Sequence, residues 1–152
     1  MGNKNNYELR YLSEEFYNKY NEADYPEIER KVQRPYIVLL IKVEGNTFAL
    51  PLRTNIRHNS CYKFRNSSRQ TDSATGIDFS KAVVVAEERY IGEIAEIDNK
   101  EYVELNERIA FIISKFSTYV RGYYMYAAGR ANEYRAKEYR YTTLKYFHKE
   151  LG

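Results

Sequence analysis

The stretch from Tyr36 to Leu52, YIVLLIKVEGNTFALPL, decides the fold of this chain of 152 residues. It opens with aliphatic and β-branched residues at 36–43, turns at Gly45, and continues with a second apolar run at 47–52. Two such runs joined by a short glycine-containing turn are typical of a β-hairpin. Because proline has no backbone N–H, Pro51 predicts that the second strand ends at a sheet edge or a bulge.

Patterns on both sides of this hairpin predict further strands first and helices last. Alternation of apolar and polar residues at 7–11 indicates a strand, and Ser13 is suited to cap a helix that follows it. The polar stretch 21–34 is expected to be a loop or a short irregular helix. Apolar runs at 81–86 and 89–94 predict two more strands.

The C-terminal third has helical periodicity. Asp98 followed by Glu101 resembles a capping box, and apolar side chains recur at helical spacing from 102 to 119. Gly122 is expected to end this helix, and a second helix is expected to run from after Gly129 to about Glu150. Its predicted buried stripe comprises Tyr134, Tyr141, Leu144 and Phe147. Strands followed by helices predict an α+β fold, built on an antiparallel sheet or small barrel, in a single domain spanning 1–152.

The charge pattern favours a polyanionic partner. The formal net charge is +3; basic residues stand without acids at 53–69 and in excess at 121–149, whereas 87–107 is acidic. Tyrosine can stack on unpaired RNA bases, and the chain has 17 tyrosines. The alternative is that the charges are ordinary surface and that most of the rings pack inside.

Other classes of protein do not fit the composition. No apolar run approaches the roughly 18 residues of a membrane span, and the N-terminus lacks the apolar core of a secretory signal. A cytoplasmic protein without membrane contact is therefore expected. One cysteine and two distant histidines offer no cluster with metal-ligand spacing, so we expect neither a metal nor another cofactor.

The residues after the hairpin suit RNA cleavage. Arg53, Thr54, Asn55 and His58 follow directly on the second predicted strand. Attack by the RNA's own 2′-hydroxyl needs a proton acceptor, donors for the charge on the phosphorane oxygens, and an acid for the departing 5′-oxygen. Arginine donates two hydrogen bonds to a phosphate, and histidine side chains change protonation near neutral pH. Each residue also has a structural interpretation, such as a salt bridge for Arg53 or a turn for Asn55.

A second group lies at Gly76-Ile-Asp-Phe-Ser-Lys81, just before a predicted strand. Asp78 is suited to orient a base or an arginine, and Ser80 and Lys81 are suited to bind phosphate. The alternative is a loop that caps the strand, with Lys81 at the surface. The cleavage hypothesis requires this group to meet residues 53–58 in space.

Nearly the whole chain resembles the ToxN/AbiQ family, the endoribonuclease toxins of type III toxin–antitoxin systems, and it looks closest to the CptN/TenpN branch. The similarity is sharpest in Pro51-Leu-Arg-Thr-Asn55 and in the segment 76–81. The resemblance implies a compact, strongly bent antiparallel sheet like that of MazF-type toxins, with flanking helices, two of them C-terminal. It also implies metal-independent cleavage of cellular RNA that leaves a 2′,3′-cyclic phosphate.

The family also implies a partner. Its members are inhibited by a small antitoxin RNA, which the toxin cuts from a tandem-repeat transcript and which folds as a pseudoknot. Toxin and RNA units alternate in a closed assembly, and such systems serve in phage defence. The alternatives from other classes are a non-catalytic RNA-binding module and a MazF-like ribonuclease with a protein antitoxin.

Family residues carry over at a few positions. Arg53 and Thr54 occupy the place of the active-site pair after Pro-Leu, which reads Thr-Ser in ToxN itself. Lys81 aligns with a lysine entering the later strand, and Tyr36 stands where ToxN has a lysine. His58 belongs to the pattern of this branch and is the best candidate for acid or base.

These arguments define two sets of predicted residues. Catalytic roles are expected for Arg53, Thr54, Asn55, His58, Asp78, Ser80 and Lys81. In this hypothesis Arg53 and Lys81 stabilise the phosphorane and His58 moves a proton. RNA binding is expected for Tyr36, Arg57, Lys63, Arg65, Arg130, Arg135, Lys137 and Arg140.

Overall fold

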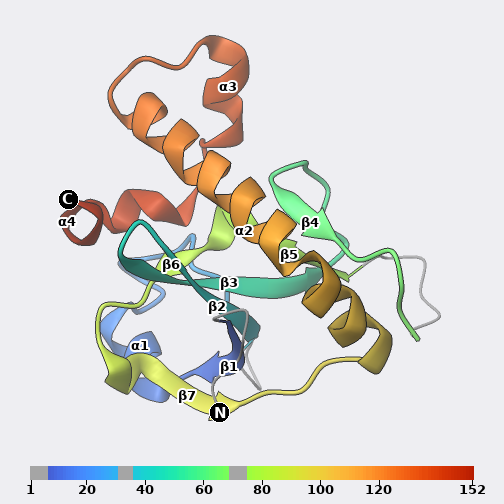
Figure 1. Ribbon diagram of the computed structural model, residues 1–152. Coiled ribbons are helices and arrows are strands. Elements are labelled where there is room, and N and C mark those ends of the chain that lie inside the picture. The colour runs from blue at the N-terminus through green and yellow to red at the C-terminus, as the bar shows by residue number, and fades with distance from the viewer. Residues whose placement is uncertain (1–6, 31–35, 69–74) are drawn as a thin grey trace.

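The computed structural model describes residues 7–30, 36–68 and 75–152 and confirms an α+β fold (Figure 1). Seven strands form an antiparallel sheet in the order β4-β5-β3-β2-β1-β7, with β6 paired to β3. The strands are β1 (Glu8–Leu12), β2 (Ile37–Val43), β3 (Asn46–Thr54), β4 (Cys61–Lys63), β5 (Thr75–Asp78), β6 (Val83–Val84) and β7 (Ile91–Ile94). The helices are α1 (Glu14–Lys19), α2 (Asn99–Ala127), α3 (Glu133–Glu138) and α4 (His148–Leu151), and short 3-10 turns are η1 (Phe79–Lys81), η2 (Glu88–Tyr90) and η3 (Thr143–Tyr146).

The predicted hairpin forms the centre of the sheet. Strands β2 and β3 pair in register along their length. Glu44 and Gly45 make the turn with φ values of 50° and 83°, the left-handed conformations that a tight hairpin turn requires. Residues 38–41 of β2 are all buried, which explains why this strand has a continuous apolar run instead of an alternating pattern.

Pro51 does not lie at a sheet edge, contrary to the prediction. Strand β3 is interior, because β2 pairs with one side of it while β5 and β6 share the other. Strand β6 is in register with Phe48 and Ala49, and β5 is in register with residues 52–54. Pro51 therefore falls between these two partners, where the missing N–H leaves neither ladder incomplete.

The alternative of a closed barrel is wrong for the residues that the structure describes. Within them, β4 pairs with β5 alone and β7 with β1 alone, so the sheet keeps two open edges. Strand β4 has three residues and β7 has four. Edge strands this short offer little backbone for pairing with another chain.

The N-terminal elements begin as predicted. Strand β1 pairs with β2, and Ser13 caps α1 by accepting the backbone N–H of Phe16. Residues 21–30 contain turns but no helix or strand, as expected for a loop. The last part of that predicted loop, 31–34, lies outside the described residues.

The two later strands are shorter than predicted. Lys81 belongs to η1, and the predicted strand 81–86 narrows to the two residues of β6. Residues 82–85 are nevertheless buried, because η3 packs over them and the Thr143 hydroxyl donates to the carbonyl oxygen of Ala82. The apolar run therefore correctly indicated buried residues, although only two of them pair with a neighbouring strand. In the predicted strand 89–94, η2 takes the beginning and β7 the rest.

Helix α2 crosses one face of the sheet (Figure 1) and starts as predicted. Asp98 accepts the backbone N–H groups of Lys100 and Glu101 at 3.1 and 3.2 Å. The Phe116 ring packs edge-on against Phe48 and Phe79, with centroids 5.0 and 5.4 Å away. The predicted apolar stripe is confirmed for Leu105, Ile109, Ile112, Phe116 and Tyr119, which are buried. No helix in the described ranges is long and apolar enough to cross a membrane.

The prediction that Gly122 ends this helix is wrong. Helix α2 continues to Ala127, and the positive φ of 73° at Gly129 follows its end. Gly122 lies inside the helix because Tyr139 packs against it: a Cβ there would lie 2.1 Å from the tyrosine hydroxyl oxygen. The glycine serves a close approach of two segments and not a helix end.

Replacing Gly122 with alanine should therefore lower the free energy of unfolding by about 1–3 kcal/mol, despite alanine's higher helix propensity. Tyr139 is buried and donates its hydroxyl to the carbonyl oxygen of Tyr119 at 2.8 Å, so its ring cannot move away freely. Urea unfolding measures the loss. Repeating Gly122→Ala in a Tyr139→Phe background should recover part of it, and an identical loss in both backgrounds would contradict this explanation.

The expected second helix over 129–150 is also wrong. The segment forms α3, η3 and α4, separated by turns. Helix α3 ends at Glu138, and Thr142 caps η3, since its hydroxyl accepts the N–H of Leu144 and also the hydroxyl of Tyr119. Of the predicted stripe, Leu144 and Phe147 are buried, whereas Tyr134 and Tyr141 are 79% and 62% exposed.

Candidate active site

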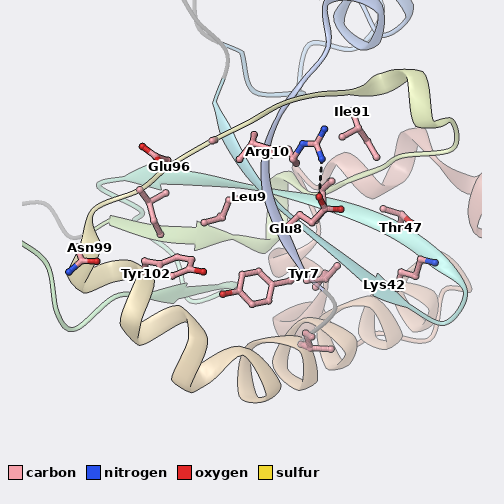
Figure 2. Close-up of a pocket in the computed structure, with 16 residues that line it drawn as sticks. Tyr7, Glu8, Leu9, Arg10, Lys42, Thr47, Ile91, Glu96, Asn99 and Tyr102 are labelled. Carbon is pink, nitrogen blue, oxygen red and sulfur yellow. Dashed lines mark hydrogen bonds and ion pairs between the residues drawn. The ribbon is translucent and has the colours of Figure 1, made fainter. Parts of the chain in front are cut away.

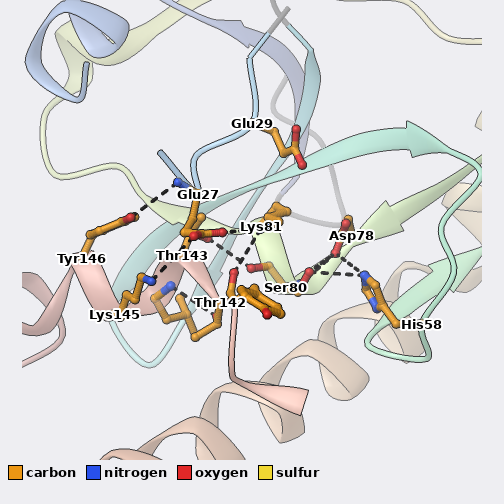
Figure 3. A network of polar contacts seen from close by, with 12 residues as sticks. Glu27, Glu29, His58, Asp78, Ser80, Lys81, Thr142, Thr143, Lys145 and Tyr146 are labelled. Atoms are coloured by element: carbon orange, nitrogen blue, oxygen red, sulfur yellow. Dashed lines mark hydrogen bonds and ion pairs between the residues drawn. The ribbon is translucent and has the colours of Figure 1, made fainter. Parts of the chain in front are cut away.

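The two segments required by the cleavage hypothesis lie side by side (Figure 3). Strand β3 pairs with β5, with Arg53 opposite Gly76, and β4 pairs with β5, with Cys61 opposite Asp78. Strand β5 is therefore enclosed between two neighbours. Gly76 allows this fit, because a Cβ there would lie 2.7 Å from the carbonyl oxygen of Tyr62. The sheet thus brings the end of β3 next to the start of η1.

Asp78 holds this site together. Its Oδ2 accepts a hydrogen bond from Arg53 Nη1 at 2.5 Å, and its Oδ1 accepts the backbone N–H and the hydroxyl of Ser80 at 2.9 and 2.6 Å. His58 Nε2 lies 3.2 Å from the same Oδ1 and 3.3 Å from Ser80 Oγ. The Asp78 side chain is fully buried, whereas those of Arg53 and His58 are 26% and 41% exposed. A buried carboxylate thus presents an arginine and an imidazole to solvent at one place.

The surroundings keep Asp78 ionised. Burial alone would raise the pKa of this carboxyl, because it removes water from the charge. The hydrogen bonds from His58, Ser80 and Arg53 outweigh burial and hold the pKa of Asp78 below its ordinary value. Burial alone would lower the pKa of Arg53, and the neighbouring carboxylates of Asp78 and Glu29 raise it overall.

The tautomer of the His58 ring follows from its partners. Nδ1 accepts the backbone N–H of Ser60 at 3.1 Å, so Nδ1 carries no proton. The ring proton is then on Nε2, which faces Asp78 and Ser80. Protonation at Nδ1 would break the bond with Ser60. In this arrangement His58 is an N–H donor at the edge of the site.

Sequence reasoning missed two glutamates that face the predicted cations. Glu29 Oε1 lies 3.3 Å from Arg53 Nη2, and Glu27 Oε2 lies 3.4 Å from Lys81 Nζ. Both come from the loop after α1, where Ile28 between them is buried. The available signal was the alternation of Glu27, Ile28 and Glu29 in the sequence. Residues two positions apart lie on the same side of an extended chain, so the pattern could have indicated two neighbouring carboxylates.

Unlike Arg53, His58 and Ser80, Lys81 does not contact Asp78 in the structure but has other partners. Its ammonium donates to the carbonyl oxygen of Tyr141 at 3.0 Å and pairs with Glu27 (Figure 3). Only 13% of its side chain is exposed. Lys81 therefore connects η1 to the C-terminal segment and lies beside the Arg53–Asp78–His58 cluster.

Four other predicted residues lie around this cluster. Thr54 ends β3, and Asn55 follows with a left-handed φ of 58°, a conformation that asparagine tolerates and that turns the chain out of the strand. Both side chains are exposed, as is that of Arg57. Tyr36 is half-buried and, after Asp78 and Glu29, adds to the raised pKa of Arg53.

The start of α2 holds the basic loop that follows β4. The Glu104 carboxylate accepts the backbone N–H groups of Arg65 and Asn66 at 2.7–3.0 Å, and the hydroxyl of Tyr62. Burial alone would raise the pKa of Glu104, and these hydrogen bonds lower it overall. Lys63 and Arg65 have exposed side chains, so two predicted RNA-binding cations project from an anchored segment.

The remaining predicted cations surround α3. All are exposed: Arg130, Arg135, Lys137 and Arg140. Arg135 forms an ion pair with Glu138 at 3.5 Å. The contact between Lys81 and the backbone of Tyr141 links this region to η1. Two basic surfaces, one after β4 and one around α3, are therefore available to a polyanion.

A groove elsewhere shares no residue with the Asp78 cluster. It lies between β1, β2, β7 and the start of α2 (Figure 2). The ion pair of Arg10 and Glu8, at 2.8 Å, stands in it beside the exposed Ile94. Among residues 7–30, 36–68 and 75–152, no group of three or more His, Cys, Asp or Glu side chains is arranged to hold a metal ion.

The geometry by itself fits an anionic ligand. Arg53 is fixed by the buried Asp78 carboxylate and keeps N–H groups that are not directed to it, and an arginine placed in this way recognises phosphate oxygens. No protein-family model, no curated protein and no solved structure matches this chain.

Proposed function

We propose that this protein is a metal-independent endoribonuclease, the toxin of a type III toxin–antitoxin system of the ToxN/AbiQ kind. The observation that carries the proposal is the placement of Arg53 and His58 on one buried carboxylate, Asp78. The cleavage hypothesis requires residues 53–58 to lie close to residues 78–81, and the pairing of β3 with β5 brings them together. The resemblance of the sequence to this family supports the reaction type, and the antiparallel sheet is compatible with a MazF-like core.

The proposed reaction is attack of a 2′-oxygen on the adjacent phosphorus, which expels the 5′-oxygen and leaves a 2′,3′-cyclic phosphate. Arg53 has N–H groups beyond those directed to Asp78 and Glu29, and these would stabilise the charge that grows on the phosphorane oxygens. The Nε2–H of His58 faces Asp78 and Ser80, and it would donate a hydrogen bond to the departing 5′-oxygen only after turning away from them. Full proton transfer from His58 would require the doubly protonated ring, and therefore release of the Ser60 N–H.

The other predicted residues have supporting roles. Thr54 and Asn55, exposed at the end of β3, would position the scissile phosphate. Ser80 holds the orientation of Asp78 and His58. Lys81 would reach the phosphorane only after its pair with Glu27 opens.

The RNA strand would follow the two basic surfaces. The residues proposed to bind it are Tyr36, Arg57, Lys63, Arg65, Arg130, Arg135, Lys137 and Arg140. Such contacts to the backbone of RNA depend on salt, because cations on the protein release counterions. The proposed partners are a small repeat-encoded antitoxin RNA, in a closed assembly with the toxin, and cellular RNA in the cytoplasm.

Incubating the purified protein with single-stranded RNA in excess EDTA tests this function. Discrete fragments with 2′,3′-cyclic phosphate and 5′-hydroxyl ends are expected. RNA that is bound but stays intact would favour the alternative, an RNA-binding module without catalysis. A small RNA that copurifies with the protein would support an RNA antitoxin, and a copurifying protein would support a protein antitoxin.

A further inference from the structure

We propose that Glu29 is the general base, the group that accepts the proton of the attacking 2′-hydroxyl. This inference rests on the proposed function, because it assigns a role within that reaction. Cleavage by a 2′-oxygen needs a proton acceptor within hydrogen-bond reach of the hydroxyl that attacks the bound phosphate. Glu29 offers a carboxylate beside the proposed phosphate-binding cation: its Oε1 lies 3.3 Å from Arg53 Nη2, and 25% of its side chain is exposed.

The other acceptors of the cluster are already occupied. Both oxygens of Asp78 accept hydrogen bonds from protein groups, and its side chain is fully buried, so a substrate hydroxyl cannot reach it. Nδ1 of His58 accepts the N–H of Ser60, and Nε2 carries the ring proton. Ser80 Oγ donates to Asp78 and faces the His58 ring.

Glu27, the other carboxylate of the loop, is held by different partners. It lies 3.4 Å from Lys81 Nζ and 4.0 Å from Lys145 Nζ, so two ammonium groups share its charge (Figure 3). Among the described residues, Arg53 is the ion-pair partner of Glu29. Since Arg53 would also bind the phosphate, its planar guanidinium can hold base and phosphorus in a fixed relation.

The proposed step balances without a metal or a further reactant. A carboxylate oxygen of Glu29 takes the proton of the 2′-hydroxyl while the 2′-oxygen forms its bond to phosphorus. The bond from phosphorus to the 5′-oxygen breaks, and that oxygen takes a proton from a water molecule, assisted by the hydrogen bond from His58. The hydroxide that remains removes the proton from Glu29 and restores the carboxylate.

Charged and titratable groups from several neighbouring elements lie around this base, and Arg53 is the one whose contact with it is described above. They are Glu27 and Arg30 in the same loop, Tyr36 before β2, Arg53 on β3, His58 after β3, and Asp78 and Lys81 at η1. A general base must be deprotonated to act, so the cleavage rate should rise with pH on an acidic limb that depends on the carboxylate at position 29.

Single-turnover cleavage of an RNA oligonucleotide over about pH 5–9 tests the assignment. Glu29→Gln should lower the rate by about 10²–10⁴-fold, remove the acidic limb and leave RNA binding nearly unchanged. Glu29→Asp keeps a carboxylate and should retain the limb with part of the rate. Glu22→Gln removes the same charge from an exposed position of the same loop and should cleave as the wild type does.

Each other outcome overturns the assignment. Faster cleavage by Glu29→Gln would show that Glu29 competes with phosphate for Arg53. Slower cleavage with the acidic limb intact would make Glu29 a positioning residue. If the wild type cleaves RNA and Glu29→Gln cleaves it at the same rate, Glu29 is not the base, but the proposed function stands. If the wild type does not cleave RNA, both the proposed function and the assignment of its base are wrong.

Discussion

Replacing Arg53 with alanine is expected to slow RNA cleavage by about 10²–10³-fold at saturating RNA. The guanidinium is the partly exposed cation of the site, and it is fixed by Asp78 at 2.5 Å, so little reorganisation is needed as charge develops on the phosphorane. Arg53→Lys keeps the charge but loses the planar fork, and its rate should fall between those of alanine and the wild type. Single-turnover rates with a defined RNA oligonucleotide give the comparison.

The matched control is Arg89→Ala. Arg89 is an exposed arginine on η2 that pairs with Glu87, outside the proposed site, and its removal should leave cleavage unchanged. Because Arg53 also neutralises the buried Asp78, circular dichroism and urea unfolding must show that the Arg53 variants are folded. A folded Arg53→Ala protein that cleaves at the wild-type rate would exclude this arginine from the mechanism.

Replacing Asp78 with asparagine is expected to lower the free energy of unfolding by about 3 kcal/mol. The amide has nearly the same size, but it leaves the Arg53 guanidinium without its buried counter-charge and weakens the acceptor for Ser80 and His58. Urea unfolding at neutral pH measures the loss. Asp24→Asn, at an exposed turn, serves as control and should change stability by no more than about 0.5 kcal/mol.

Stability should also depend on pH through Asp78. Its folded-state pKa is lowered, so the carboxylate contributes stability above the unfolded-state value of about 3.9 and loses it as the pH falls through the folded-state pKa. The wild type and Asp78→Asn should therefore differ most at about pH 6 and converge well below about pH 4. A difference in unfolding free energy that stays constant over this range would disprove the contribution.

The elements that could be predicted have local causes. The hairpin of β2 and β3 follows from two apolar runs and a turn at Glu44 and Gly45, all within the 18 consecutive residues 37–54. The start of α2 follows from the Asp98 cap and the spacing of the apolar residues after it. The errors have distant causes. Gly122 lies inside α2 because Tyr139 packs where a side chain would be, and η3 begins after Thr142, which Tyr119 contacts.

For the candidate site too, local sequence indicates some features and distant contacts decide the others. Residue types suited to phosphate chemistry stand directly after β3 and before β6, so Arg53, His58 and Asp78 could be named from the sequence. Their mutual geometry could not. Glu29 was missed because the alternation at residues 27–29 does not say which cation its carboxylate faces, and Arg53 lies 24 positions further along the chain.

By itself, the sequence determined the strands of the hairpin, the start and apolar face of α2, and the identity of most groups at the site, because each depends on neighbours in the chain. The tertiary structure decided which of those groups meet. Arg53 reaches Asp78 across 25 positions because β5 pairs with β3, and Lys81 turns to Glu27 across 54 positions because the loop after α1 packs against η1. Such partners are selected by packing and strand pairing, which local residue patterns do not predict.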